Sequence, residues 1–158
     1  MILRPEYRYC RRRAASCEFE LIDLLRDFSS CDYNHVLTRN WYIAEVDEYN
    51  PYIHSEKLEH IYGWGTQIAS NGILVHGETF METVGTIHQI ENGLFMRVID
   101  ANMPIQLPPP PHIFLWHGQE TFHSPNVDIE IRIDALCYEI ITENQSIIDC
   151  ITEKYTLC

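Results

Sequence analysis

The sequence has no apolar run that approaches the ~20 residues a helix needs to cross a bilayer. The arginines near its start are not followed by the apolar stretch of a secretory signal, so we expect a soluble intracellular protein. A mean hydropathy of -0.19 and a hydrophobic content of 46% are those of a globular chain. The 158 residues are enough for one domain that buries a sizeable core.

The sequence also lacks the short motifs that mark common catalytic and metal sites. It contains no GxxxxGK phosphate loop, no GxSxG nucleophile elbow and no HExxH zinc motif. Its six cysteines include no Cys-x-x-Cys pair, which excludes a zinc ribbon or a thioredoxin-like site. We expect reduced thiols, with Cys137 and Cys150 as small strand residues. We therefore expect a non-enzymatic protein with no cofactor and no metal.

Basic residues are scarce, with 11 Lys and Arg against 23 Asp and Glu, and the net charge is -12. Five of the basic residues fall within residues 1–13, so the rest of the chain is strongly acidic. Such a body is repelled by phosphate backbones at long range, and any nucleic-acid contact must be local or shared with a basic partner. The acids can also serve solubility alone, and the arginine run is either a solvated tail or a nuclear-import or phosphate-binding patch.

Residues 1–49 are predicted to form an extension with one amphipathic helix over residues 16–28. Its apolar stripe, at the spacing i, i+3, i+4 and i+7, comprises Leu21, Leu24, Leu25 and Phe28. This stripe either packs on the protein's own domain or binds a partner. The four residues are therefore our candidate partner-binding residues.

Residues 50–158 are predicted to form a mainly β domain. Before this domain a short strand is predicted over 41–46, and the domain itself begins with a short helix over 52–62. Its predicted strands are residues 73–75, 80–90, 94–100, 103–107, 127–141 and 146–157. Asn92-Gly93 between two alternating runs predicts a type I′ hairpin turn, which needs positive φ. Three meandering strands, a long connection and a final hairpin are the order of a five-stranded OB-fold barrel, closed between its first and last strands.

The connection contains four consecutive prolines at residues 108–111. Such a run is either a stiff polyproline spacer or a ligand for an SH3 or WW domain.

Four short segments carry a resemblance to a known family. They are residues 50–61, 72–77, 84–87 (VGTI) and 98–100 (VID). Together they look like the N-terminal OB domain of the middle subunit of the CST telomere-capping complex and, more weakly, that of replication protein A. The resemblance covers residues 50–158 and extends to the shortened OB proteins of insect telomere-capping complexes. It implies a subunit of a single-stranded-DNA or chromosome-end complex in the nucleus, with another OB-fold or scaffold protein as partner.

OB proteins bind single strands on the face of strands two and three, between two framing loops. The positions of this sequence that match that surface are Phe95, Arg97, His88, Asn92 and Tyr138. One phenylalanine and one arginine are too few for tight single-strand binding, because each stacked base contributes only about 1–3 kcal/mol. We therefore expect a protein–protein adaptor with weak DNA contact.

The sequence is also compatible with two other functional hypotheses. One is an acidic interaction module of a viral or immunity type that binds a basic protein surface without nucleic acid. The other is a β-barrel that holds a small ligand, which requires a cavity in place of a filled interior.

Overall fold

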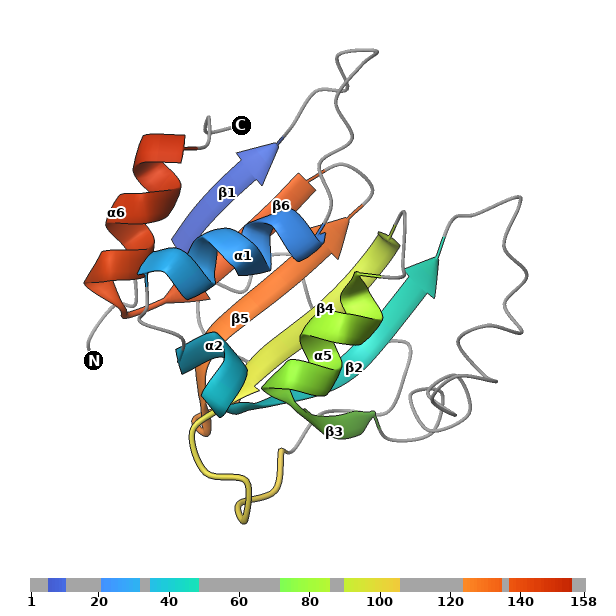
Figure 1. Cartoon of the computed structure of the whole chain (residues 1–158). Coiled ribbons are helices and arrows are strands. Elements are labelled where there is room, and N and C mark those ends of the chain that lie inside the picture. Colours follow the sequence, from blue (N-terminus) through green and yellow to red (C-terminus); the bar gives the residue numbers. More distant parts are fainter. Residues whose placement is uncertain are drawn as a thin grey trace.

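The computed structural model describes residues 6–10, 21–31, 35–48, 72–85, 90–105, 124–134 and 137–154, and the statements below concern these residues. They form one antiparallel sheet with helices packed on one of its faces (Figure 1). The strands are β1 (Glu6–Cys10), β2 (Asn40–Glu48), β3 (Ile73–His76), β4 (Ile90–Val98), β5 (Val127–Asp134) and β6 (Cys137–Thr142). The helices are α1 (Leu21–Cys31), α2 (His35–Thr38), α5 (Gly77–Val84) and α6 (Gln145–Lys154).

The sheet has six strands in the order β1-β6-β5-β4-β2-β3, and every neighbouring pair is antiparallel. Within the described residues β1 and β3 are its two edges, so the sheet is open and the predicted closure into an OB-fold barrel is not observed. The prediction of a mainly β antiparallel fold is confirmed. β1 and β2 pair with strands from the second half of the chain, so the boundary expected between residues 49 and 50 does not divide the sheet.

Several predicted elements are confirmed. α1 carries the predicted apolar stripe, β2 contains the strand expected at 41–46, and β3 contains the strand expected at 73–75. The strand predicted over residues 127–141 is observed as two separate strands, β5 and β6. The helix expected over residues 52–62 and the prolines at 108–111 lie outside the described residues.

The strand predicted over residues 80–90 is wrong over its first half, where the chain forms α5. The buried residues Phe80 and Val84 recur at helical spacing, and Thr83 is buried beside them. His76 is the N-cap, and its Nδ1 accepts a hydrogen bond from the Glu78 amide. Val84 of the VGTI segment therefore lies in a helix and not in a first barrel strand.

The strand predicted over residues 146–157 is also wrong, because the chain forms α6 there. The Asn144 side chain accepts hydrogen bonds from the amides of Ser146 and Ile147 and so caps the helix. Ile147 and Ile151 are fully buried one helical turn apart.

The hairpin predicted at Asn92-Gly93 is replaced by a continuous central strand, in which Asn92 is paired with Asp47 on one side and Asp134 on the other. Gly93 is required there for a steric reason and not for positive φ. A Cβ at this position would lie 2.3 Å from the Phe95 ring, which covers Gly93 on the same face. The strand predicted over 103–107 is not observed at residues 103–105, and residues 106–107 lie outside the described residues.

The main core lies between the helices and the facing side of the sheet. At its centre Phe80 of α5 stacks on Trp41 of β2 with ring centroids 4.7 Å apart, and its ring is tilted against that of Phe95 of β4 at 5.6 Å. Ile129, Ile131 and Ile133 of β5 extend this core toward α1 and α6. None of the described helices is long and apolar enough to span a membrane.

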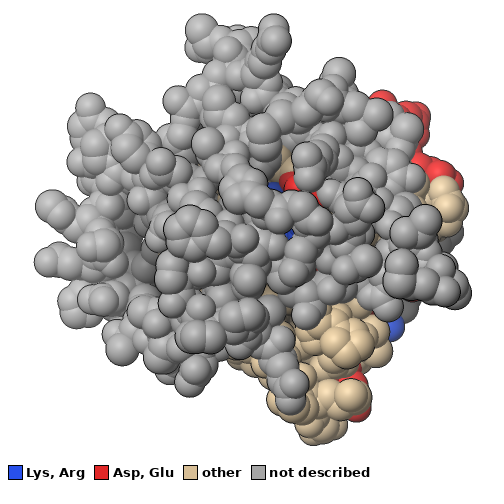
Figure 2. Space-filling model, turned by 180° about the vertical axis from the view of Figure 1, so that it is seen from behind, with Lys and Arg blue, Asp and Glu red and all other residues tan. Residues whose placement is uncertain are grey.

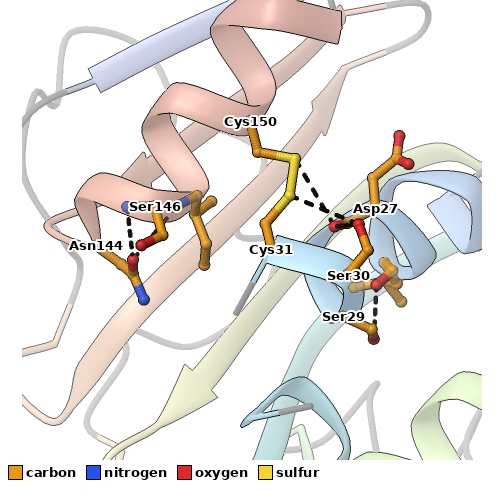
Figure 3. Close-up of a disulfide and its surroundings, with 9 residues drawn as sticks. Asp27, Ser29, Ser30, Cys31, Asn144, Ser146 and Cys150 are labelled. Atoms are coloured by element: carbon orange, nitrogen blue, oxygen red, sulfur yellow. Dashed lines mark hydrogen bonds between the residues drawn. A yellow bond between two sulfur atoms is a disulfide. The ribbon is translucent and has the colours of Figure 1, made fainter. Parts of the chain in front are cut away.

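A disulfide joins Cys31 at the end of α1 to Cys150 of α6 (Figure 3). The expectation of reduced thiols is wrong for this pair, and Cys150 lies in a helix and not in a strand. The pairing spans 119 residues, a distance at which spacing gives no indication of which cysteines meet.

Candidate functional site: a fixed apolar turn at one end of the sheet

The side chains predicted to contact DNA do not form an exposed platform. Phe95, Arg97 and Tyr138 have exposed fractions of 0%, 2% and 7%. Residues 94–98 form a strand as predicted, but the strand face that carries Phe95 is covered by the helix layer containing α5, a segment that the sequence predicts as a strand. His88 and the side chain of Asn92 lie outside the described residues.

The four candidate partner-binding residues of α1 are buried as well. Leu21, Leu24, Leu25 and Phe28 all belong to the main core. Of the two alternatives for this stripe, packing on the protein's own domain is therefore the one observed.

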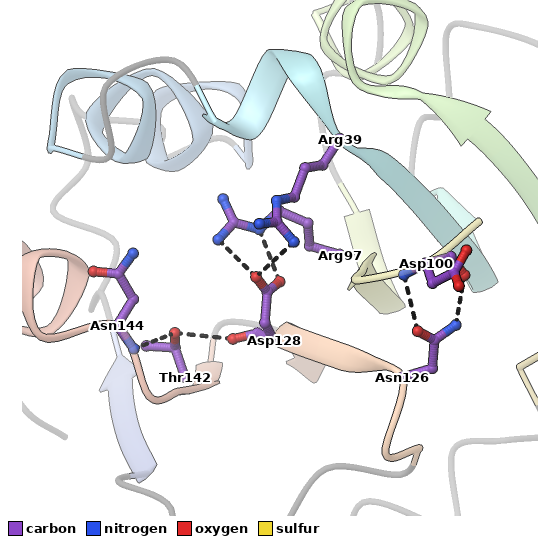
Figure 4. Close-up of polar contacts among 7 residues, drawn as sticks. All are labelled: Arg39, Arg97, Asp100, Asn126, Asp128, Thr142 and Asn144. Carbon is purple, nitrogen blue, oxygen red and sulfur yellow. Dashed lines mark hydrogen bonds and ion pairs between the residues drawn. The ribbon is translucent and has the colours of Figure 1, made fainter. Parts of the chain in front are cut away.

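An exposed candidate site lies where β4 ends and β5 begins. The chain leaves β4 at Val98 and turns through residues 99–105, which we call the 99–105 turn. The buried side chain of Asn126, one residue before β5, holds this turn (Figure 4). Its Oδ1 accepts from the Asp100 amide at 2.9 Å, and its Nδ2 donates to the carbonyl oxygens of Asp100 at 2.8 Å and Met103 at 3.0 Å.

Further hydrogen bonds fix the rest of the turn. The Asp100 carboxylate accepts from the Asn102 amide at 2.9 Å, and the Met103 amide donates to the Asp100 carbonyl at 3.1 Å. The Ile99 amide donates to the carbonyl of Asn126 at 3.0 Å. Hydrogen bonds thus fix the backbone of the turn between residues 99 and 103.

This turn exposes two large apolar side chains, Ile99 at 53% and Met103 at 54%. Of the described residues only Leu74 on the edge strand β3, at 43%, is another large hydrophobic residue with comparable exposure. Ile105 at the end of the turn packs against the apolar cluster on the sheet face opposite the helices. Seen from that side, the described surface at the lower edge of the molecule is mostly uncharged (Figure 2).

Beside the turn, two arginines converge on one carboxylate (Figure 4). The buried Arg97 binds Asp128 with both Nε, at 2.9 Å, and Nη2, at 3.1 Å. Arg39, which is 36% exposed, places Nη1 3.5 Å from the same carboxylate. The register of β4 and β5 shifts at this point, between Arg97 and Val98, which directs Asp128 toward the arginines.

The same cluster connects to the start of α6. The Thr142 hydroxyl donates to the Asp128 carbonyl at 3.0 Å and accepts from the Asn144 amide at 3.1 Å. Asn144 is the cap of α6, so this end of the sheet and the last described helix share one hydrogen-bond network.

The opposite sheet face carries a second, more deeply buried charge network. Arg132 Nε lies 2.7 Å from the Glu130 carboxylate, and its Nη1 lies 2.9 Å from that of Glu139. Glu130 and Arg132 have exposed fractions of 0% and 1% and lie opposite Met96 and Leu94 of β4. Nearby on this face, burial raises the pKa of the Tyr42 phenol above its usual value of 10.0.

The sequence predicts strands over 94–100 and 103–107, with Ile99 in the first and Met103 in the second. The two side chains are therefore not predicted to share one exposed turn. The signal that could have located the site is Asn126, a side chain able to replace a backbone partner at the start of an alternating run.

Comparison of the chain with protein-family models, with curated proteins and with solved structures finds no match.

Proposed function

We propose that this chain is a non-enzymatic protein-interaction subunit that binds its partner through the 99–105 turn. The observation that carries the proposal is the combination of a backbone fixed by Asn126 with two large apolar side chains that are more than half exposed. Single exposed apolar residues are common, but two on one hydrogen-bonded turn, with three residues between them, form a compact anchor.

A fixed turn suits binding because less conformational entropy is lost when the partner docks. Ile99 and Met103 can enter a pocket without reorganisation of the backbone between them. The unbranched Met103 adapts to the shape of that pocket, as methionines do at binding surfaces. These properties are those of anchor residues at protein–protein interfaces.

The charge of the chain indicates the chemistry of the partner. The described surface exposes the acidic residues Glu78, Glu82, Asp100, Glu143, Asp149 and Glu153. Together with a net charge of -12, they favour a partner whose apolar pocket is bordered by lysine or arginine. Such a partner associates faster at low ionic strength, because opposite fields steer the encounter.

Membership in a single-stranded-DNA or chromosome-end complex, which the sequence resemblance implies, is part of this proposal. In that setting the acidic chain serves as the adaptor and a basic partner supplies the DNA contact. The burial of Phe95 and Arg97 supports this division, because neither side chain can stack on a base in the folded chain.

The first experiment uses matched baits in a native extract, with captured proteins quantified by mass spectrometry. The wild-type chain is compared with an Ile99→Ser, Met103→Ser double variant and with a Leu74→Ser control that removes an exposed apolar residue elsewhere. We expect the double variant to lose the partner that wild type and control retain, with an affinity at least about tenfold lower once the partner is purified. Equal binding by all three chains would refute the 99–105 turn as the docking surface.

A second measurement tests the nucleic-acid part separately. Single-strand binding is measured for the chain alone, for the partner alone and for the assembly, over a range of salt concentrations. We expect no binding by the chain alone and salt-sensitive binding by the assembly. Tight binding by the isolated chain would show that the adaptor assignment is wrong.

A further inference from the structure

The Cys31–Cys150 disulfide joins two helices from opposite halves of the chain (Figure 3). Cys31 is the last residue of α1, and Cys150 lies in the middle of α6. α1 contributes five buried residues to the core and is anchored independently of the disulfide. α6 contributes the buried residues Ile147, Ile148 and Ile151, is capped at Asn144, and is covalently joined to α1 by this bond.

The two cysteines differ in their exposure to solvent. Cys150 has an exposed fraction of 6%, whereas Cys31 is half-buried at the end of its helix. An incoming thiolate must align with the S–S bond and therefore reaches Cys31 Sγ more readily, with Cys150 as the leaving group.

The surroundings also accommodate the reduced pair. Cys150 Sγ lies 3.8 Å from the Asp27 carbonyl oxygen, an acceptor that a thiol can use and a disulfide sulfur, which has no hydrogen, cannot. Cys31 Sγ lies 3.6 Å from the Ser30 hydroxyl, whose own hydrogen is directed at the Asp27 carbonyl at 2.7 Å. Each thiol thus has an acceptor in place, so opening the bond leaves no buried donor unsatisfied.

We propose that Cys31 is a thiol-exchange site and that the Cys31–Cys150 disulfide is a reversible latch on α6. A thiolate of the glutathione class attacks Cys31 Sγ, the S–S bond breaks, and Cys150 leaves as a thiolate that takes a proton from water. A second thiol then displaces the first from Cys31, which yields two protein thiols and one small-molecule disulfide. The two electrons that reduce the protein come from the two thiols.

Opening the latch loosens α6 and leaves the sheet intact. The bond closes a loop of more than a hundred residues, so its loss removes a long-range restraint on α6. The strands retain their ladders and the aromatic centre of the core, neither of which involves α6. The reduced chain is therefore a folded protein with a mobile last helix.

The test is amide hydrogen exchange of the full chain, read out by mass spectrometry, after equilibration in buffers of oxidised and reduced glutathione. Peptide mapping without reduction first identifies the Cys31–Cys150 linkage in the oxidised sample. On reduction we expect exchange in residues 145–154 to accelerate by roughly tenfold or more, while β4 and β5 stay protected. A Cys31→Ser, Cys150→Ser variant should resemble the reduced chain in both buffers.

Three outcomes would overturn the proposal. The first is the absence of the linkage from the oxidised protein. The second is a bond that resists glutathione until the chain is denatured, which would make it a static crosslink. The third is an equal acceleration of exchange in α6 and in β4 and β5, which would indicate global unfolding. If the serine variant does not fold, the comparison of oxidised and reduced wild-type protein still decides between these outcomes.

Discussion

The two faces of the sheet are buried by different means. On the helix-covered face, apolar side chains from β2, β4 and β5 meet those of α1, α5 and α6, with Trp41, Phe80 and Phe95 at the centre. On the other face a smaller apolar cluster lies beside the buried ion network of Glu130, Arg132 and Glu139.

The strand β5 contributes to both interiors, with apolar side chains on one face and charged side chains on the other. Along β5 the isoleucines face the helices, and the residues between them, Glu130 and Arg132, face the other way. Apolar packing tolerates changes of shape at moderate cost, whereas a buried ion pair is stable only while both partners are present. The second face should therefore be the less tolerant of single substitutions.

The largest effect is expected from Arg132→Met, which keeps side-chain volume and removes the charge. It leaves Glu130, which is fully buried, without the guanidinium 2.7 Å away. We expect the free energy of unfolding to fall by about 3–5 kcal/mol. Urea denaturation at neutral pH, followed by circular dichroism, measures the change.

A triple variant, Glu130→Leu with Arg132→Met and Glu139→Leu, is the matched comparison. Because it removes the charges together, it should cost less than Arg132→Met alone. If the triple variant is less stable than Arg132→Met, the charged side chains stabilise the fold by more than neutralising one another.

The next largest effect is expected from Asn126→Ala, which removes the side chain that holds the 99–105 turn. Ile105 of this turn packs on the second face, so the substitution also loosens the edge of that face. Loss of the bonds to Asp100 and Met103 should cost about 1–3 kcal/mol, because three part-buried hydrogen bonds are removed together. Thermal unfolding measures this cost, and weakened partner binding by a chain that is still folded would link the turn to function.

A smaller effect is expected from Ile131→Val on the helix-covered face, adjacent in sequence to Arg132. It removes one methylene from a fully buried side chain and should cost about 0.5–1.5 kcal/mol. Measured beside Arg132→Met under the same conditions, it compares the two faces at neighbouring positions of one strand. Equal costs would contradict the contrast between them.

The local patterns in the sequence predicted part of this fold. The stripe of α1 and the alternation of β5 each follow from their own periodicity, and both are confirmed. α5 and α6 are not predicted, because short runs of mixed apolar and polar residues fit both the helical and the strand period; the signals that distinguish them are the capping residues His76 and Asn144. Because residues 80–84 are predicted as a strand, no helix is expected over the face of Phe95, and Phe95 is therefore predicted to be available for DNA binding.

The candidate site was less predictable than the fold. Its organising contacts join Asn126 to residues 23 and 26 positions earlier, and the disulfide joins positions 119 apart. Such pairings depend on where the sheet brings distant segments together, which periodicity does not encode. Gly93 illustrates the same limit, because its role is set by the ring of Phe95 and not by turn chemistry.

The smallest effect concerns Tyr42, which lies on the second face where burial raises the pKa of its phenol above 10.0. A raised pKa means that the folded state holds the proton more tightly than the unfolded state. The associated stability is therefore fully present below pH 10.0 and is lost as the pH rises through the folded pKa. Absorbance titration of the phenolate in wild type and in Tyr42→Phe isolates this group among the nine tyrosines. If the difference spectrum titrates at the ordinary value, the second face is open to water at Tyr42, and the contrast between the faces is limited to the region of Glu130 and Arg132.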